Sequence, residues 1–379
     1  MKSTSCDQAA RGVLADCVAG RPPKRIPATL LQDECAPALF GVLVEGLADR
    51  FEPALCEIYA RLFATVFPGA DLARYDRVRR PRPVQWMPRR LYVLSRVTLG
   101  ADIAVTSVLM DAAKQRFPKA QIVFVGPRKN FELFAADRRL VHAPLNYRKG
   151  TLHDRLAAWS ELQALADDLV IDPDSRLTQL GLLPVGTEAR YHLFESRRYG
   201  SETADALPEL AAQWATATFG VPHAKPYLGL PEGPLPRPAP YIAVSLGVGE
   251  NPAKRLPDPF ESELLKLLAT RHPLVVDRGA GGEESARVER AARGLDAMLF
   301  EGPFAGFARI ISGAALYVGY DSAGQHAAAA LGIPLISIFA GFPAPRMFDR
   351  WRPVTPNATV IRVDNPDPVE VLARVNAAL

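Results

Sequence analysis

The chain has 379 residues, of which 48% are hydrophobic and 23% are charged, with 45 basic and 41 acidic side chains. This length suits two α/β domains with an extension, and the composition excludes a disordered chain. The net charge of +4 suits anionic ligands but is too small for a protein that coats nucleic acid. The N-terminus lacks the apolar core of a signal peptide and no stretch approaches the ~20 apolar residues of a membrane span, so we expect a cytoplasmic protein.

Residues 1–90 are predicted to form a helical extension that ends in a linker. Residues 28–51 and 53–67 carry apolar side chains at helical spacing. Residues 74–90 contain seven arginines and three prolines, which favours an irregular connection over a helix or a central strand. One interpretation is that these arginines contact phosphate-bearing acceptors or the anionic inner membrane face. The alternative is that they belong to a solvated connector.

The cysteines all lie within the first 56 residues, and none is spaced as CxxC. A zinc site or a disulfide framework usually shows tighter or paired spacing. We therefore expect reduced thiols buried among helices at all of these positions, namely Cys6, Cys17, Cys35 and Cys56.

Strand and helix patterns alternate from residue 91 onward. In residues 91–225 we expect strands at 91–95, 121–126 and 169–175, a helix at 102–117 and another helix from about residue 175. This alternation predicts a parallel sheet with helices on both faces. Residues 91–225 are thus predicted to be a first Rossmann-like domain.

The same alternation recurs after the proline-rich residues 226–240. Residues 241–365 are predicted to form a second Rossmann-like domain, and residues 366–379 a helix that packs back toward the first domain. Ligands of such sheets bind at the carboxyl ends of the strands, which favours a site between the two domains. The expected strands are 241–247, 274–277, 315–319 and 334–339, and the expected helices are 259–270, 283–293 and 322–331.

The turn at residues 321–324 is the clearest indication of a binding site. A strand ends there and a helix begins, so backbone N–H groups and the helix dipole favour an anion. The small residues Ser322, Ala323 and Gly324 would let a diphosphate approach the backbone closely. His326 either donates to a phosphate oxygen or is an ordinary histidine, and Asp321 is a site residue, the helix N-cap or both.

Further candidate side chains follow other predicted strands. Lys254 comes after a glycine-rich loop and could neutralise a departing diphosphate. Glu283 and Glu284 either accept ribose hydroxyls or merely favour the start of a helix. Asp102, expected at a helix start, is either a general base that is ionised at pH 7 or a plain N-cap.

Taken together, residues 91–379 resemble the family 9 glycosyltransferases, whose best-known members are ADP-heptose:lipopolysaccharide heptosyltransferases of the GT-B fold. Residues 96–103 are similar to that family's R-x-S-S-L-G-D-V, with the glycine one position early. Residues 321–326 are similar to its D-[ST]-G-x-x-H, with the glycine one position late. Residues 254–257 and 279–284 are similar to K-x-W-P and G-x-P-x-E-E. Several motifs in the correct order are more specific than any one alone.

The resemblance implies an α/β protein of two facing Rossmann-like domains that acts as an inverting, metal-independent glycosyltransferase without a cofactor. It favours ADP-heptose as the nucleotide-sugar donor and a glycan, glycolipid or other hydroxyl as acceptor, as in lipopolysaccharide core synthesis. Asp102 would be the catalytic base. The implied donor-binding residues are Lys254, Glu283, Asp321, Ser322, Ala323, Gly324 and His326, and the supporting residues are Arg96, Gly100, Gly247 and Gly279.

Other classes of function stay open at this point. One is a catalytically decayed glycosyltransferase-like binding or scaffold protein. The other is an oxidoreductase with two Rossmann domains, although neither domain has G-x-G-x-x-G after its first strand.

Overall fold

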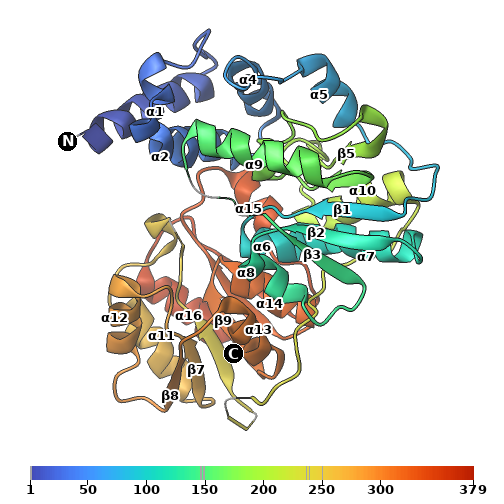
Figure 1. The fold of residues 1–379 in the computed structure, drawn as a ribbon. Helices are drawn as coiled ribbons and strands as arrows, with labels where there is room; N and C mark the ends of the chain where they lie inside the picture. The colour runs from blue at the N-terminus through green and yellow to red at the C-terminus, as the bar shows by residue number, and fades with distance from the viewer. Residues whose placement is uncertain (1, 146, 148–149, 236, 239, 250) are drawn as a thin grey trace.

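A computed structural model of the chain describes residues 2–145, 147, 150–235, 237–238, 240–249 and 251–379. The described residues form two separate parallel sheets with helices packed on both faces, below a helical N-terminal extension (Figure 1). The predicted fold class is confirmed, since every strand expected from the sequence is present. No helix within the described ranges is both long and apolar enough to cross a membrane.

The first sheet has the strand order β3-β2-β1-β4-β5, so β1 lies at its centre. Successive β1 residues point to opposite faces: Leu91 and Val93 enter one hydrophobic core, and Tyr92 and Leu94 enter another. The strands are β1 (Arg90–Leu94), β2 (Gln121–Gly126), β3 (Leu140–Pro144), β4 (Leu169–Asp172) and β5 (Tyr191–Leu193). The helices are α6 (Leu99–Ala101), α7 (Ser107–Arg116), α8 (Arg128–Phe131), α9 (Leu152–Leu165) and α10 (Leu207–Phe219).

The second sheet has the strand order β11-β10-β9-β6-β7-β8. Its strands are β6 (Ile242–Ser245), β7 (Leu274–Asp277), β8 (Ala297–Phe300), β9 (Leu316–Tyr320), β10 (Leu335–Phe339) and β11 (Ala358–Arg362). Its helices are α11 (Phe260–Ala269), α12 (Gly282–Ala291), α13 (Phe304–Ser312), α14 (Ala323–Leu331), α15 (Pro345–Trp351) and α16 (Pro368–Ala378).

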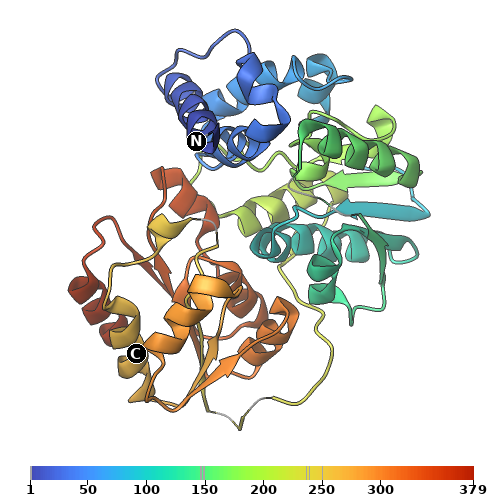
Figure 2. The same ribbon diagram turned by 60° about the vertical axis from the view of Figure 1, so that its left-hand side comes forward.

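The last helix, α16, does not pack back toward the first domain as expected. It lies against α11 and β11, and its Val371 and Val375 belong to the core on one face of the second sheet. Helix α15 makes the return contact instead, because Arg346 and Arg350 donate to backbone carbonyls of residues 200–205. Both views place α15 beside the first domain and α16 on the outer side of the second (Figures 1 and 2).

The extension is part of the core of the first domain. It consists of α1 (Lys2–Val18), α2 (Ala36–Ala38), a π-helical segment (Leu39–Val44), α3 (Glu45–Ala48), α4 (Pro53–Ala64) and α5 (Leu72–Val78). Leu43, Leu47 and Phe63 of the extension share one apolar cluster with Val125 and Tyr191 of the first sheet. The extension therefore cannot separate from that sheet without exposing a buried apolar surface.

Part of the predicted linker is helical, contrary to expectation. Helix α5 (Leu72–Val78) begins where the side chain of Asp71 accepts a hydrogen bond from the backbone N–H of Arg74. Tyr75 and Val78 are buried on its inner face. The first proline of residues 74–90 is Pro81, so the helix ends before proline can interrupt it.

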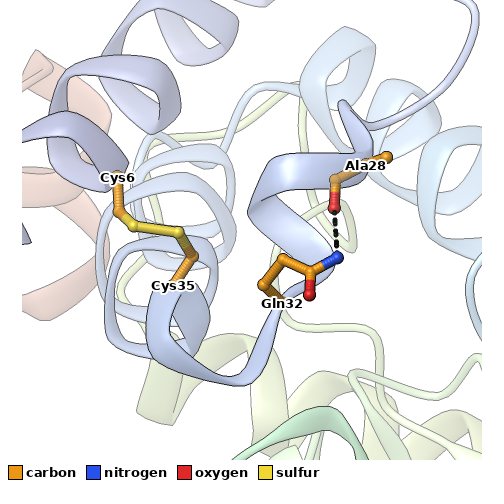
Figure 3. The surroundings of a disulfide bond; sticks show 4 residues. All are labelled: Cys6, Ala28, Gln32 and Cys35. Carbon is orange, nitrogen blue, oxygen red and sulfur yellow. Dashed lines mark hydrogen bonds between the residues drawn. A yellow bond between two sulfur atoms is a disulfide. The ribbon is translucent and has the colours of Figure 1, made fainter. Parts of the chain in front are cut away.

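The prediction that all cysteines are reduced is wrong for Cys6 and Cys35, which form a disulfide with their Cα atoms 5.3 Å apart (Figure 3). Cys6 lies in α1, and Cys35 lies in the turn before α2. Packing of α1 against residues 33–44 brings the two together, so their sequence separation of 29 gave no local signal. Cys17 and Cys56 are free and buried, as expected.

We predict that Phe63→Ala destabilises the first domain and not only the extension. Phe63 is fully buried and stacks between Tyr59 and Phe67, so removing its ring should lower the free energy of unfolding by ~3–5 kcal/mol. Urea unfolding followed by tryptophan fluorescence measures this, with Val18→Ala as a control because Val18 is 40% exposed. A separate early transition confined to the extension would contradict the shared core.

Candidate active site

The predicted phosphate-binding turn lies at the amino end of α14. Ser322 occupies the N-cap position in an extended conformation, and its side chain makes no capping hydrogen bond. Its hydroxyl group is buried and lies beside the Tyr317 hydroxyl. The first backbone N–H groups of α14 thus lack a side-chain cap, which is the arrangement that favours an anion at a helix N-terminus.

Gly324 is required by packing inside the second domain. A Cβ at this position would meet the hydroxyl of Tyr317, which is fully buried. A Cβ at Gly319 would be 2.5 Å from the same hydroxyl oxygen. The tyrosine therefore explains why the glycine of this motif stands at residue 324.

Asp321 and Lys254 form an ion pair beside this turn. The Lys254 ammonium group lies 2.6 Å from an Asp321 carboxylate oxygen and 3.2 Å from the Asp321 carbonyl oxygen. The other carboxylate oxygen accepts a hydrogen bond of 2.5 Å from the side chain of Gln325. Asp321 therefore does not cap α14, and it positions the lysine charge at the end of β9.

Gln325 is a residue of this region that the sequence analysis missed. Its side chain is fully buried, accepts from the Ser337 hydroxyl of β10 and donates to the Trp351 carbonyl oxygen at 3.2 Å. The signal in the sequence was a glutamine on a helix of mostly small apolar residues. A buried amide needs hydrogen-bond partners for its polar atoms, so such a glutamine indicates a polar contact inside the protein.

His326 lies on the same helix, and its side chain is buried. Its ring is 5.7 Å from the Trp351 ring in an edge-on contact, and its Nε2 atom is 3.3 Å from the Gln325 amide. Burial lowers the pKa of His326 to about 4, and the nearby Lys254 acts in the same direction while Asp321 opposes it. The imidazole is therefore neutral at pH 7 and has one N–H to donate.

The acidic residue at the ends of β6 and β7 is Glu284 rather than Glu283. Glu283 is exposed at the start of α12. Glu284 folds back over the glycine turns. A Cβ added at Gly247 would lie 2.7 Å from a Glu284 carboxylate oxygen, and a Cβ added at Gly279 would lie 2.6 Å from the same oxygen. The glycines at 247 and 279 thus make room for a carboxylate, which suits a ribose-binding position.

Asp102 is placed differently from the prediction. The helix begins at Leu99 with Thr98 as its N-cap, so Asp102 lies within the helical run and not at its head. The carboxylate is fully buried and accepts hydrogen bonds of 2.5–2.7 Å from Ser95, the Arg96 backbone, Thr106 and Asn130. Burial raises the pKa of Asp102, while these hydrogen bonds oppose the shift. In this conformation Asp102 anchors the β1–α6 turn, and its role as a base stays a prediction.

The two domains and the extension meet at Trp351, a place that we call the Trp351 junction. The Trp351 ring contacts Phe51 of the extension at 6.2 Å, His326 at 5.7 Å and the guanidinium of Arg96 at 5.8 Å. Arg96 is buried and donates to the Pro173 carbonyl and the Ser196 hydroxyl, and burial lowers its pKa to about 10. The junction fixes how the carboxyl ends of the two sheets face each other.

Gly100 of the first domain lies directly against α14 of the second. A Cβ added at Gly100 would be 3.1 Å from the His326 ring and 3.3 Å from the Cα atom of Ala323. Helix α6 and the segment after it pack closely on α14. The structure therefore brings the turn before Asp102 and the turn before α14 together, as a site between domains requires.

The arginines of residues 74–90 are largely bound to the protein itself. Arg74 and Arg82 donate to backbone carbonyls of residues 186–191, and Arg77 and Arg79 pair with Glu188 and Glu57. These contacts explain much of the basic segment without a membrane or an acceptor.

Cavities and metal ligands add no residue to the site. A cavity of about 590 Å³ is lined by Arg79, Arg80, Glu195, Arg198 and neighbouring residues, and another of about 400 Å³ lies near Trp86 and Arg190. The predicted donor-binding residues line neither of these two cavities. Within the described ranges, no group of at least three His, Cys, Asp or Glu side chains is arranged to hold a metal ion.

We predict that Gly100→Ala weakens the contact between the domains. The added methyl group must displace His326 or Ala323, which should cost ~1–3 kcal/mol of unfolding free energy. Chemical denaturation measures this, and Gly12→Ala in α1 is the matched control, because nothing lies within 4 Å of its added Cβ. A Gly100→Ala protein as stable as wild type would show that the domains are not held together here in solution.

Comparison with known proteins identifies the second half of the chain. The family described as Glycosyltransferase family 9 (heptosyltransferase) matches residues 188–374. A search of curated protein sequences found no significant match.

Solved structures share the fold across both domains. The Escherichia coli heptosyltransferase WaaC with ADP aligns with 76% of this chain and 100% of its own, at 19% identity and a TM-score of 0.56. The E. coli ADP-heptose LPS heptosyltransferase II aligns with 76% of this chain over 98% of its own length, at 20% identity and a TM-score of 0.51. A family 9 glycosyl transferase from Veillonella parvula aligns with 77% of this chain over 90% of its own length, at 14% identity and a TM-score of 0.57. The resemblance seen in the motifs is confirmed: the chain has the GT-B fold and carries a family 9 glycosyltransferase domain.

Proposed function

We propose that this glycosyltransferase moves a sugar, with inversion, from a nucleoside diphosphate donor to an acceptor hydroxyl, and that ADP-heptose is the donor. The observation that carries the proposal is the turn before α14, where the helix has no side-chain cap and the Lys254 ammonium group lies alongside. The similarity to the E. coli heptosyltransferase WaaC with ADP and to the E. coli ADP-heptose LPS heptosyltransferase II supports this choice of nucleotide and sugar.

The donor residues have distinct proposed roles. The diphosphate binds the backbone N–H groups of Ala323 and Gly324 and the Ser322 hydroxyl, where the helix dipole favours negative charge. Lys254 neutralises the leaving diphosphate, and neutral His326 donates its N–H to a phosphate oxygen. Glu284, in place of Glu283, accepts hydrogen bonds from the ribose hydroxyls.

We propose that these groups stabilise the leaving diphosphate without a metal ion or other cofactor. Each preorganised donor of this kind typically contributes ~2.7–4 kcal/mol to transition-state stabilisation. The acceptor is proposed to be a glycan or glycolipid hydroxyl of the lipopolysaccharide core type. Contact with an anionic membrane would use Arg80 and Arg89, which are exposed, rather than the arginines bound within the protein.

A nucleotide panel tests the donor. ADP should raise the melting temperature more than UDP, GDP or CDP, because ligand binding at ~100 times Kd adds about 2.7 kcal/mol of stability. Differential scanning fluorimetry measures the shift, and calorimetry gives the affinity. A selective response to another nucleotide would contradict the adenine assignment.

Lys254→Ala should lower kcat for ADP-heptose turnover by ~10²–10³-fold, because the leaving diphosphate loses its cation. Lys266→Ala is the matched control, since Lys266 is exposed on α11 and pairs with Glu263. Release of ADP measures the rate.

The same assay should give an unchanged rate in EDTA and no increase with added Mg²⁺ or Mn²⁺. A strict requirement for either ion would overturn the metal-independent mechanism.

A further inference from the structure

Gln325 is a fully buried polar residue on α14, one position before His326. Its side-chain amide is hydrogen-bonded to the Asp321 carboxylate after β9, the Ser337 hydroxyl of β10 and the Trp351 carbonyl oxygen at the end of α15. Burying an amide costs free energy unless its polar atoms are paired, and an apolar side chain would make no such demand. The partners of this amide therefore indicate what it does.

The orientation of the amide follows from these partners. A carboxylate only accepts hydrogen bonds, so the NH₂ group of Gln325 must face Asp321, where the two atoms are 2.5 Å apart. On the other side, the Ser337 hydroxyl donates to the amide oxygen. A flipped amide would set its oxygen against the carboxylate, and both of these groups would be acceptors. One N–H of the amide is thus committed to Asp321.

The contact with Asp321 extends to the lysine that we assign to the leaving group. One Asp321 carboxylate oxygen accepts from Gln325, and the other accepts from the Lys254 ammonium group at 2.6 Å. The carboxylate cannot rotate without losing one of these hydrogen bonds. A lysine side chain is long and flexible, so its charge has a fixed place only where a partner holds it. Here Asp321 holds Lys254, and Gln325 holds Asp321.

The same amide determines which nitrogen of His326 carries the proton. The Gln325 nitrogen is 3.3 Å from His326 Nε2 and 3.2 Å from the Trp351 carbonyl oxygen, so its second N–H is shared between them. An amide nitrogen only donates, and Nε2 must therefore accept. Because burial lowers the pKa of His326 to about 4, the ring is neutral at pH 7 and its single proton lies on Nδ1.

We propose that Gln325 is a positioning residue for the departure of the diphosphate. It holds Asp321, and through Asp321 the Lys254 ammonium group, beside the turn before α14. It also keeps His326 protonated on Nδ1, so that this N–H is the one donated to a phosphate oxygen. The inference rests on the proposed function. Groups that stabilise a leaving group are effective when they are fixed before the bond breaks, so the role of Gln325 should appear in kcat.

Two substitutions separate the hydrogen bond from the charge at this position. Gln325→Met fills a similar space and donates nothing, so Asp321 loses its amide partner at every pH. The carboxyl group introduced by Gln325→Glu titrates. When protonated, its O–H donates to Asp321 and its other oxygen accepts from Ser337, as the amide does now. When ionised, it opposes Asp321 as a second carboxylate, and two carboxylates in contact repel each other.

The surroundings of position 325 set the direction of that titration. Complete burial and the adjacent Asp321 carboxylate both favour the protonated form of the introduced carboxyl group. The nearby cations Lys254 and Arg96 act in the opposite direction, and His326 is neutral. Since the contact with Asp321 is in place below the pKa of the introduced group, it should be lost as the pH rises.

The test follows ADP release from ADP-heptose and compares each variant with wild type at the same pH. Gln325→Met should lower kcat by ~10²-fold throughout, the loss typical of one preorganised donor. Gln325→Glu should stay within ~10-fold of wild type at about pH 6 and fall to the rate of Gln325→Met by about pH 9. Gln115→Glu is the matched control, because Gln115 also donates to an aspartate four residues earlier, Asp111, but is exposed on α7. It should match wild type at every pH.

Nitrogen NMR of isotope-labelled histidine tests the second part of the proposal without any donor. The His326 signals, identified by their loss in His326→Asn, should show the proton on Nδ1 in wild type. In Gln325→Met a larger fraction should carry the proton on Nε2, because the amide that faces this nitrogen is gone.

Each other result has a definite meaning. A Gln325→Met protein with the wild-type kcat, or a Gln325→Glu protein whose pH profile follows wild type, overturns the role of Gln325 and leaves the donor assignment intact. A proton on Nε2 of His326 in wild type also overturns it. Should neither variant fold, the wild-type spectrum decides alone. A wild type that does not consume ADP-heptose refutes the proposed donor, while the spectrum still tests Gln325.

Discussion

The packing of α15 between the two domains is the contact on which the site depends. Arg350 is 1% exposed and donates to the backbone carbonyls of Gly200 and Asp205 in the first domain. Hydrogen bonds from a charged donor are stronger than neutral ones, and losing them would leave a buried cation unpaired. The helix therefore holds Trp351 firmly against Phe51, Arg96 and His326, and the turns at the carboxyl ends of both sheets are brought together as a consequence.

The extension changes what the first domain can present to an acceptor. Its contacts lie just beyond the carboxyl ends of β4 and β5: Tyr59 donates to the Gln179 carbonyl, and Tyr75 donates to Glu195. Ligands of parallel sheets approach at that same edge. The extension therefore lies beside the edge of the first sheet at which ligands of parallel sheets bind.

Periodicity and turn residues were sufficient to predict the inner strands of both sheets, because these strands are apolar runs. The edge strands β3, β5, β8 and β11 were not predicted. The turn between β9 and α14 was also predictable, since small residues follow an apolar run there, while its role in donor binding stays a prediction. Contacts between distant segments were not predictable from one sequence. The disulfide, the direction in which α16 packs and the choice between Glu283 and Glu284 all depend on tertiary packing that no local pattern encodes. Asp102 shows a further limit, because a motif aspartate can anchor a turn as well as face a substrate.

Each displaced glycine has an explanation in packing, Gly100 between the domains and Gly324 inside the second domain. Gly100 stands where the family pattern has leucine, and Ala323 stands where it has glycine, yet the two residues are neighbours in space. A Cβ at residue 100 would meet the His326 ring and the backbone of Ala323, so Gly100 allows α6 to pack closely on α14. At the same time, Gly324 accommodates the Tyr317 hydroxyl. Packing in this structure thus requires both Gly100 and Gly324, and their displacement from the family pattern is therefore not by itself a sign of a decayed site.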